Sequence, residues 1–212
     1  MKTWEHPGGK LIEEGAHTLS QDELFEILIG SGYQGRSAKD ITKKLLDNYF
    51  SIYGLWNKTF DDLSEIKGLK NGKIKRIAAP YEIGKRIIKE NKWDLPAVRK
   101  VTLGLPDYTD DGLLAVLICS GHGDKTPLDL AKALLKKYKS LSGITGENLS
   151  DLWKTSFRGL ELLGNYYSSA SFLSREKMHE MAKIKGLGDV KVVRVAAAYE
   201  IARRLIKLIA KE

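Results

Sequence analysis

The sequence has few of the residues on which disulfide bonds and metal sites depend. Its 212 residues include one cysteine, Cys119, and four histidines that show no ligand spacing. A single cysteine excludes an internal disulfide bond and a zinc site built on cysteine pairs. Because Cys119 lies in an apolar run, we expect its thiol to be packed in the interior. The sequence therefore predicts no metal site and no cofactor.

Long hydrophobic stretches are also missing. The longest apolar run, from Leu113 to Cys119, has seven residues, whereas a helix needs about 20 to cross a bilayer. Residues 1–9 include Trp, Glu and His, where a secretory signal would be apolar. We therefore expect a cytoplasmic protein without a membrane partner.

Positive charge, by contrast, is abundant and unevenly distributed. The chain carries 35 Lys and Arg against 27 Asp and Glu, a net charge of +8. Residues 63–92 hold nine bases and three acids, and residues 175–212 hold ten and five, so these segments carry +6 and +5 while the remainder carries −3. Basic charge gathered in two segments is typical of a protein that binds a polyanion.

The chain contains two copies of one sequence pattern. Residues 19–55 align with residues 108–144 at an offset of 89, with 13 identities in 37 positions. Residues 63–89 align with residues 181–207 at an offset of 118, with 14 identities in 27 positions. Self-similarity at this level indicates a duplicated structural unit.

The duplication predicts two tandem domains, residues 1–92 and 93–212. The change in offset, 118 minus 89, places an insert of 29 residues between positions 145 and 180. Apolar residues recur at three and four spacing without strict alternation, so both domains should be helical. Each ends in a long helix, Lys73 to Glu90 and Val190 to Lys211. We predict an all-α fold in which a pseudo-two-fold axis relates the two domains.

Side-chain caps mark the starts of further helices. Ser20 begins a capping box, and Thr109 occupies the corresponding position in the second copy. Ser37 and the pair Thr126-Pro127 begin the next helix of each copy.

The clearest local pattern is a tight turn between two helices, which resembles a helix-hairpin-helix motif. Glycines at 186 and 188 allow positive φ, and Leu187 between them would plug the core. The first amides of the following helix would form an anion site for a DNA phosphate. The first copy holds a matching motif. We assign DNA binding to these residues of the two motifs: Gly186, Leu187, Gly188, Val190, Lys191, Arg194, Gly68, Leu69, Lys70, Gly72, Lys73 and Arg76.

The first motif departs from the second at three positions. Lys70 stands where the second motif has its second hairpin glycine, Gly72 is displaced by two, and Pro80 should interrupt the following helix. These departures predict weaker DNA binding by the first hairpin, or a purely structural role. For the basic residues late in each long helix, Arg86, Arg203 and Arg204 among them, we expect solvation of an outer face.

The chain resembles the amino-terminal domain of RadC-type proteins, in two tandem copies. The resemblance covers residues 4–90 well and residues 93–211 apart from the insert. In the first copy it rests on Trp4, Pro7, Lys10-Leu11-Ile12, Gly15-Ala16, Leu19-Ser20, Glu23-Leu24, Ile27-Leu28, Gly32, Ser37, Leu45-Leu46, Ser51, Gly54-Leu55, Ile66-Lys67-Gly68-Leu69 and Tyr81-Glu82-Ile83. The usual second half of that family, a JAB-type metal-dependent hydrolase with a His-x-His-Pro signature, has no counterpart in this sequence. The resemblance implies a helical half that binds nucleic acid.

These observations favour a DNA-binding protein without sequence specificity, possible roles being DNA repair or recombination on duplex or branched DNA. One alternative is a repair enzyme of the glycosylase and lyase kind, which would require a lysine at the position of Val190 and an aspartate further on. A helical scaffold for protein partners is another alternative. We assign no catalytic residue and favour a binding protein over an enzyme. A monovalent cation could bind hairpin carbonyls such as those of Lys185 or Leu187, and the chain should be a monomer that forms an internal pseudo-dimer.

Overall fold

All named elements of the structure are helices. The structure is a computed structural model that describes residues 6–145 and 172–212, so most of the expected insert lies outside the described residues. Within those ranges there is no strand, only isolated bridges in two tight loops, and no helix is long and apolar enough to cross a membrane. The all-α prediction is confirmed. The elements are α1 (Pro7–Glu14), η1 (Ala16–Thr18), α2 (Gln21–Ile29), α3 (Ala38–Tyr49), α4 (Ile52–Leu55), α5 (Phe60–Ser64), α6 (Asn71–Glu90), η2 (Pro96–Lys100), α7 (Asp110–Ile118), α8 (Pro127–Tyr138), α9 (Leu141–Thr145), α11 (Arg175–Ala182) and α12 (Asp189–Ile209).

The predicted caps are confirmed. Ser20, Ser37 and Thr126 each form a reciprocal capping box with the acidic residue three positions later. Thr109 caps α7 without a box, because Gly112 stands where an acid would return the hydrogen bond. Local hydrogen bonding therefore defines where α2, α3, α7 and α8 begin.

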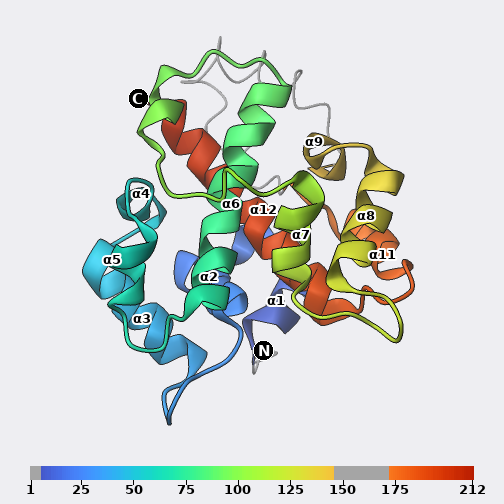
Figure 1. Cartoon of the computed structure of the whole chain (residues 1–212), viewed down its shortest axis with the longest axis horizontal. Helices are drawn as coiled ribbons and strands as arrows, with labels where there is room; N and C mark the ends of the chain where they lie inside the picture. Colours follow the sequence, from blue (N-terminus) through green and yellow to red (C-terminus); the bar gives the residue numbers. More distant parts are fainter. Residues whose placement is uncertain (1–5, 146–171) are drawn as a thin grey trace.

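Helices α6 and α12 cross at the centre of the molecule (Figure 1). They have 20 and 21 residues, and each contains a stretch that is buried on every side, residues 77–84 and 195–202. The expectation that Pro80 interrupts its helix is wrong, since α6 continues from Asn71 to Glu90. Pro80 lies inside this buried stretch, where packing on all sides compensates for the missing backbone donor.

The middle of each long helix is hydrogen bonded to its own half of the chain, while the first turns of α12 also contact α1 and α2. Tyr81 on α6 is fully buried and donates a hydrogen bond to the carbonyl of Ile52, at 2.8 Å. Tyr199 on α12 does the same with the carbonyl of Leu141, at 3.1 Å. Burial raises the pKa of both phenols, so both remain donors. The apolar residues of both halves join in one continuous core.

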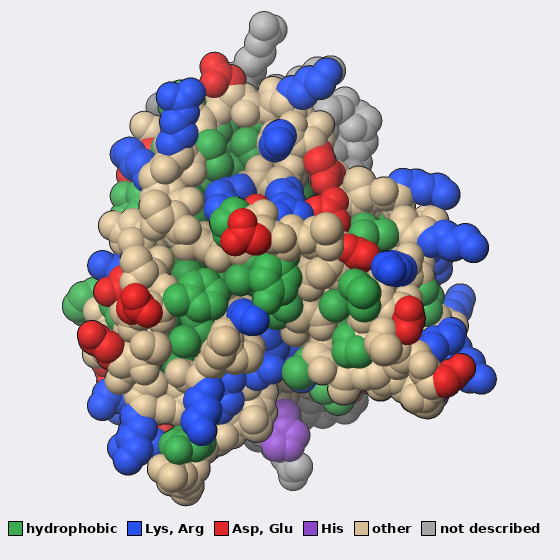
Figure 2. Space-filling view, in the orientation of Figure 1, with side chains coloured by type: hydrophobic (Ala, Val, Ile, Leu, Met, Phe, Trp, Pro, Cys, Tyr) green, Lys and Arg blue, Asp and Glu red, His purple; other side chains and the backbone are tan. Residues whose placement is uncertain are grey.

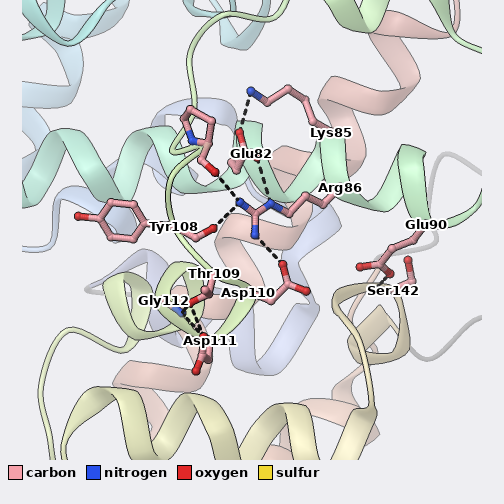
Figure 3. A network of polar contacts seen from close by, with 11 residues as sticks. Glu82, Lys85, Arg86, Glu90, Tyr108, Thr109, Asp110, Asp111, Gly112 and Ser142 are labelled. Atoms are coloured by element: carbon pink, nitrogen blue, oxygen red, sulfur yellow. Dashed lines mark hydrogen bonds and ion pairs between the residues drawn. The ribbon is translucent and has the colours of Figure 1, made fainter.

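The C-terminal part of each long helix packs on the other half of the chain. Arg86 on α6 donates to the carbonyls of Pro106 and Tyr108, just before α7 (Figure 3). Arg204 on α12 donates to the carbonyls of His17 and Leu19, just before α2. The C-terminal parts of both long helices are therefore bonded to the other half of the chain.

The sequence suggested that the arginines of this region are solvated on an outer face. In the structure they form ion pairs with buried glutamates instead. Arg86 pairs with Glu82, and Arg203 and Arg204 both pair with Glu200. The two glutamates are 6% and 0% exposed. A carboxylate buried to this degree requires a cation beside it, and this requirement draws the guanidinium groups inward.

Replacement of either buried tyrosine by phenylalanine should destabilise the fold. Tyr81→Phe and Tyr199→Phe each deprive a buried carbonyl of its donor, so we expect the free energy of unfolding to fall by about 1–3 kcal/mol. Urea unfolding measures the change, and Tyr53→Phe, at an exposed tyrosine, is the control with a change below about 0.5 kcal/mol. Wild-type midpoints for both buried variants would contradict the assigned hydrogen bonds.

Candidate nucleic-acid interface

The second hairpin joins α11 to α12 through a tight turn. Gly186 has φ +103°, and the amide of Leu187 donates to the carbonyl of Ile184 at 2.9 Å. Gly188 follows as the N-cap of α12, with φ −72° and ψ 170°. A Cβ at position 186 would lie 2.9 Å from the Cβ of His122. Both the positive φ and this close approach require glycine at the first hairpin position.

The first hairpin, between α5 and α6, has the same backbone geometry. Gly68 has φ +106°, and the amide of Leu69 donates to the carbonyl of Ile66 at 2.9 Å. Lys70 is the N-cap of α6, with φ −93° and ψ 166°. This extended conformation is open to any residue, so lysine replaces the second hairpin glycine without distortion. Neither Lys70 nor Pro80 disturbs the geometry of the first hairpin, so these two departures from the second motif do not distort it.

The hairpin leucines have a structural role. Leu69 and Leu187 are 3% and 1% exposed, which confirms that Leu187 plugs the core. Because their amides are bonded within the turns, these groups are not available to a ligand.

The backbone donors that remain available belong to the first turns of α6 and α12. No acceptor in the described part of the chain meets the amides of Asn71 and Gly72, nor those of Asp189 and Val190. These amides lie at the positive ends of two long helices. Val190 is also 70% exposed, so an approaching ligand meets little steric obstruction there.

The basic residues of the first motif are bonded to the C-terminal end of α2. Lys73 donates from Nζ to the carbonyls of Ser31 and Gly32, at 2.6 and 3.2 Å. Arg76 donates from Nε and Nη2 to the carbonyls of Leu28 and Ile29, at 2.6 and 2.8 Å. Burial and the neighbouring charge of Arg76 lower the pKa of Lys73. Both side chains cap a helix C-terminus, where cations are favourable.

The second motif repeats this arrangement at α7. Arg194 donates from Nη1 to the carbonyls of Leu117 and Ile118, at 3.0 and 3.3 Å. Lys191 donates from Nζ to the carbonyls of Gly121 and Gly186, both at 2.8 Å. A cation is thus already present at a hairpin carbonyl, in the form of an ammonium group. Lys73, Arg76, Lys191 and Arg194 are therefore brought to the hairpins and bonded to carbonyls of the protein, while Nε of Arg194 is buried without a partner among the described residues.

The two arginines approach each other where the halves meet. Burial, followed by repulsion from Arg76, lowers the pKa of Arg194. Arg76 donates from Nη1 to the sulfur of Cys119, at 3.3 Å. The expectation of a packed thiol is wrong, because Cys119 is exposed as the C-cap of α7 with φ +67°. It occupies the position that Gly30 holds after α2, where φ is +75°.

Three exposed lysines lie on the hairpin turns without such carbonyl partners: Lys67, Lys70 and Lys185. The sequence prediction included only Lys70 among them, although Lys67 and Lys185 occupy matching positions before the hairpin glycines. Between positions 66 and 73 the first hairpin has three lysines and no acid, whereas between 184 and 191 the second has two lysines and one aspartate. The first hairpin therefore has the stronger positive field.

The second hairpin also borders a groove. Its volume is about 560 Å³, and its lining includes His122, Lys185, Gly188, Val190 and Lys191. In the view of Figure 2, basic side chains lie toward α3 and toward α8, and others lie in the upper centre beside acidic ones, with hydrophobic side chains between these groups. On this face, positive charge is therefore local rather than gathered in one broad patch. Within the described ranges, no three His, Cys, Asp or Glu side chains could hold a metal ion.

Together these features define an all-α protein with two helical hairpins, each followed by a long helix with available N-terminal amides. Residues 1–75 match the family model described as UPF0758 N-terminal. This match overlaps the first-copy residues that resemble the RadC amino-terminal domain and is consistent with that resemblance.

The most informative comparisons are with UPF0758 proteins. One from Clostridium beijerinckii is 39% identical over 82 residues, which are 39% of this chain and 36% of the relative. Another, from Neisseria gonorrhoeae, is 35% identical over 116 residues, or 53% of this chain and 49% of the relative. The aligned part thus spans about a third to a half of the length of the curated relatives. No solved structure matches the chain.

The two glycines of the second hairpin should differ sharply in their tolerance of a side chain. Gly186→Ala forces a Cβ into a positive-φ position and toward His122 and Leu130, so we expect a loss of at least about 1–2 kcal/mol. At Gly188 a Cβ meets nothing within 4 Å, so Gly188→Ala should change stability by less than about 0.5 kcal/mol. Urea unfolding of both variants is the measurement, and similar effects would contradict the hairpin geometry.

Removal of either capping arginine should cost stability. Arg76→Ala and Arg194→Ala leave helix C-terminal carbonyls without their charged donors, and we expect each to lower the free energy of unfolding by about 1.5–3 kcal/mol. Lys67→Ala removes an exposed cation near the same hairpins and should cost less than about 0.5 kcal/mol. If all three variants unfold at the same urea concentration, the arginines are not structural caps.

Proposed function

We propose that this protein binds DNA without sequence specificity, through the backbone amides of two helix-hairpin-helix motifs. The observation that carries the proposal is the occurrence of one hairpin geometry twice, each time with available helix amides beside exposed lysines. Helix N-termini of this kind bind phosphate, and phosphate contacts do not distinguish bases.

Each part of the motif has a separate task in this proposal. The amides of Asn71 and Gly72, and those of Asp189 and Val190, bind phosphate oxygens. Lys67, Lys70 and Lys185 supply the charge that attracts the DNA backbone. Lys73 and Lys191 use two donors each on carbonyls, so the third N–H of each ammonium can reach a phosphate. Arg76 and Arg194 are positioning residues that orient the two helices.

We further propose that the two hairpins act as a pair, related by a pseudo-two-fold axis between tandem units 1–92 and 93–212. Corresponding caps, buried tyrosines and helix-capping cations in the two halves support this relation. Arg76 and Arg194 both donate to the C-terminal end of α7, which supports neighbouring N-terminal turns of α6 and α12. A monomer could then contact both strands of a duplex or of a branched DNA.

The resemblance to RadC amino-terminal domains, together with the UPF0758 match, supports a place in DNA repair or recombination inside the cell. A glycosylase or lyase function has less support, because Val190 stands at the lysine position that such enzymes require. Lys191, the next residue, is bonded to two carbonyls and is not a free nucleophile. A scaffold for proteins would leave the available amides and the hairpin lysines without a role.

Removal of the hairpin lysines should weaken DNA binding and its dependence on salt. For the triple variant Lys67→Ala, Lys70→Ala, Lys185→Ala, we expect the slope of log K against log salt to fall by about 3, and the affinity at ~0.1 M salt to fall at least about tenfold. Fluorescence anisotropy with a labelled duplex and a labelled four-way junction measures both quantities.

A second triple variant removes the same charge elsewhere: Lys43→Ala, Lys44→Ala and Lys136→Ala, at exposed positions on α3 and α8. It should change the affinity less than about twofold if the contacts are local to the hairpins. Equal losses in the two triple variants would overturn the assignment to the hairpins. Absence of wild-type binding at about 50 mM salt would overturn DNA binding altogether.

A further inference from the structure

A basic pocket lies at the C-terminal end of α12, far from the hairpin at its other end. Its volume is about 440 Å³, and it forms where α12 packs on α2 and α4. Its lining contains no acid among the described residues, and it contains four cations: Arg203, Arg204, Lys207 and Lys211. From Asp189 the helix extends for 21 residues, or roughly 30 Å at 1.5 Å per residue, so one phosphate cannot contact both sites.

The two arginines of the pocket are held in place and still have donors to offer. Arg203 donates from Nε and Nη2 to the carboxylate of Glu200, at 2.9 and 2.7 Å. Arg204 donates from Nε to Glu200 and from Nη2 to the carbonyls of His17 and Leu19. The Nη1 group of each guanidinium has no acceptor within the described residues. Preorganised guanidinium groups with unused donors are well suited to an oxyanion.

The lysines of the pocket add positive charge that no acid there balances. Burial lowers the pKa of Lys207, and repulsion from Arg203 and Lys211 lowers it further. Glu212 lies near the rim, where it accepts hydrogen bonds from Tyr53 and Lys100. Its charge is therefore matched by Lys100 outside the pocket. A bound anion would relieve the repulsion among the cations.

The corresponding place in the other half has the same framework but is neutralised (Figure 3). There Arg86 donates from Nη1 to Asp110 at 2.6 Å, whereas the position of Asp110 is held by Gln21 in the first half. Similarly, Glu90 corresponds to Leu208 of the pocket lining. The neutralised place has three cations and three acids, a net charge of zero: Lys85, Arg86 and Lys89 with Glu82, Asp110 and Glu90. The pocket region has four cations and one acid, a net charge of +3: Arg203, Arg204, Lys207 and Lys211 with Glu200.

We propose that this pocket is a second anion site, which binds a phosphate group through Nη1 of the two arginines and the ammonium groups of Lys207 and Lys211. The phosphate can belong to a small compound with two or more phosphate groups or to the 5′ end of a nucleic acid. The site does not depend on the proposed action of the hairpins, because it lies at the opposite end of α12.

Calorimetric titration of the full chain with inorganic pyrophosphate at about 50 mM salt, where screening is modest, tests the proposal. We expect binding that weakens at least about tenfold in Lys207→Gln, Lys211→Gln. The matched control, Lys89→Gln, Lys92→Gln, removes one exposed cation of the neutralised place and a second one three residues further along the chain, and it should bind as the wild type does. Failure of the wild type to bind up to about 10 mM pyrophosphate, a Kd too weak for a built site, or equal weakening in both variants, would overturn the site.

A second variant tests whether the absence of acids from the pocket lining is important for binding, and it removes no cation. Leu208→Glu introduces the acid found at position 90, and we expect it to weaken pyrophosphate binding at least about tenfold, because an anion then meets a fixed negative charge. Wild-type affinity in this variant, with thermal unfolding unchanged, would also count against the proposal. The hairpin variant Lys67→Ala, Lys70→Ala, Lys185→Ala should retain full pyrophosphate binding, which separates this site from the proposed DNA contacts.

The origin of the phosphate is distinguished with two single-stranded oligonucleotides that differ only in a 5′-phosphate or a 5′-hydroxyl group. A preference for the phosphorylated strand that disappears in Lys207→Gln, Lys211→Gln assigns the pocket to nucleic-acid ends. Pyrophosphate binding without such a preference assigns it to a free phosphate compound. Loss of the preference in the control Lys89→Gln, Lys92→Gln instead would contradict a pocket at this position.

Discussion

The mutual burial of α6 and α12 is the constraint on which the rest of the structure depends. Each helix is enclosed on all sides for eight residues, 77–84 and 195–202, and these stretches include the only charged side chains of the buried centre, Glu82 and Glu200, within the described residues. A helix enclosed in its middle can meet ligands only at its ends. The N-terminal ends become the hairpins, with unpaired amides, and the C-terminal ends carry the cations that Glu82 and Glu200 attract. Both candidate anion sites therefore follow from the burial of the middle of these two helices.

The packing of the long helices beside the C-terminal ends of α2 and α7 explains why the hairpin cations serve the fold before they serve a ligand. Lys73 and Arg76 lie near the N-terminus of their own helix, where they would favour a phosphate, and beside the C-terminus of α2, where they cap carbonyls. The C-terminus of α2 favours a cation directly, whereas the positive end of α6 favours one only when a phosphate is bound there, and the sequence pattern is the same in either case. An arginine whose planar donors are bonded to two carbonyls is held in a fixed orientation. A lysine bonded to two carbonyls still has a third N–H that can bind a ligand.

Features that depend on local interactions could be predicted from the sequence. Features that depend on tertiary contacts could not. The caps at Ser20 and Thr126 and the plug at Leu187 depend on neighbours a few residues away, so the sequence was sufficient for them. The exposed thiol of Cys119 could not be predicted, because an apolar run does not reveal that its last residue turns outward as a C-cap. The buried ion pairs had one usable signal, which is the recurrence of Glu82 and Glu200 inside otherwise apolar stretches. A lone acid in such a context predicts a buried cationic partner, although only the structure identifies it.

The two candidate anion sites differ from the corresponding places in the other half in where acids lie. Around these sites, three pairs of corresponding positions have one acidic and one neutral member: Asp110 and Gln21, Glu90 and Leu208, and Asp189 and Asn71. Glu90 belongs to α6, but its negative charge lies beside the second half, because its carboxylate accepts a hydrogen bond from the amide of Ser142. All three acids therefore lie on the side built from α7 and α9 or on the second hairpin. At these positions, acids are absent from the pocket of α2, α4 and α12 and from the first hairpin, and both places therefore keep more of their positive charge for an anion.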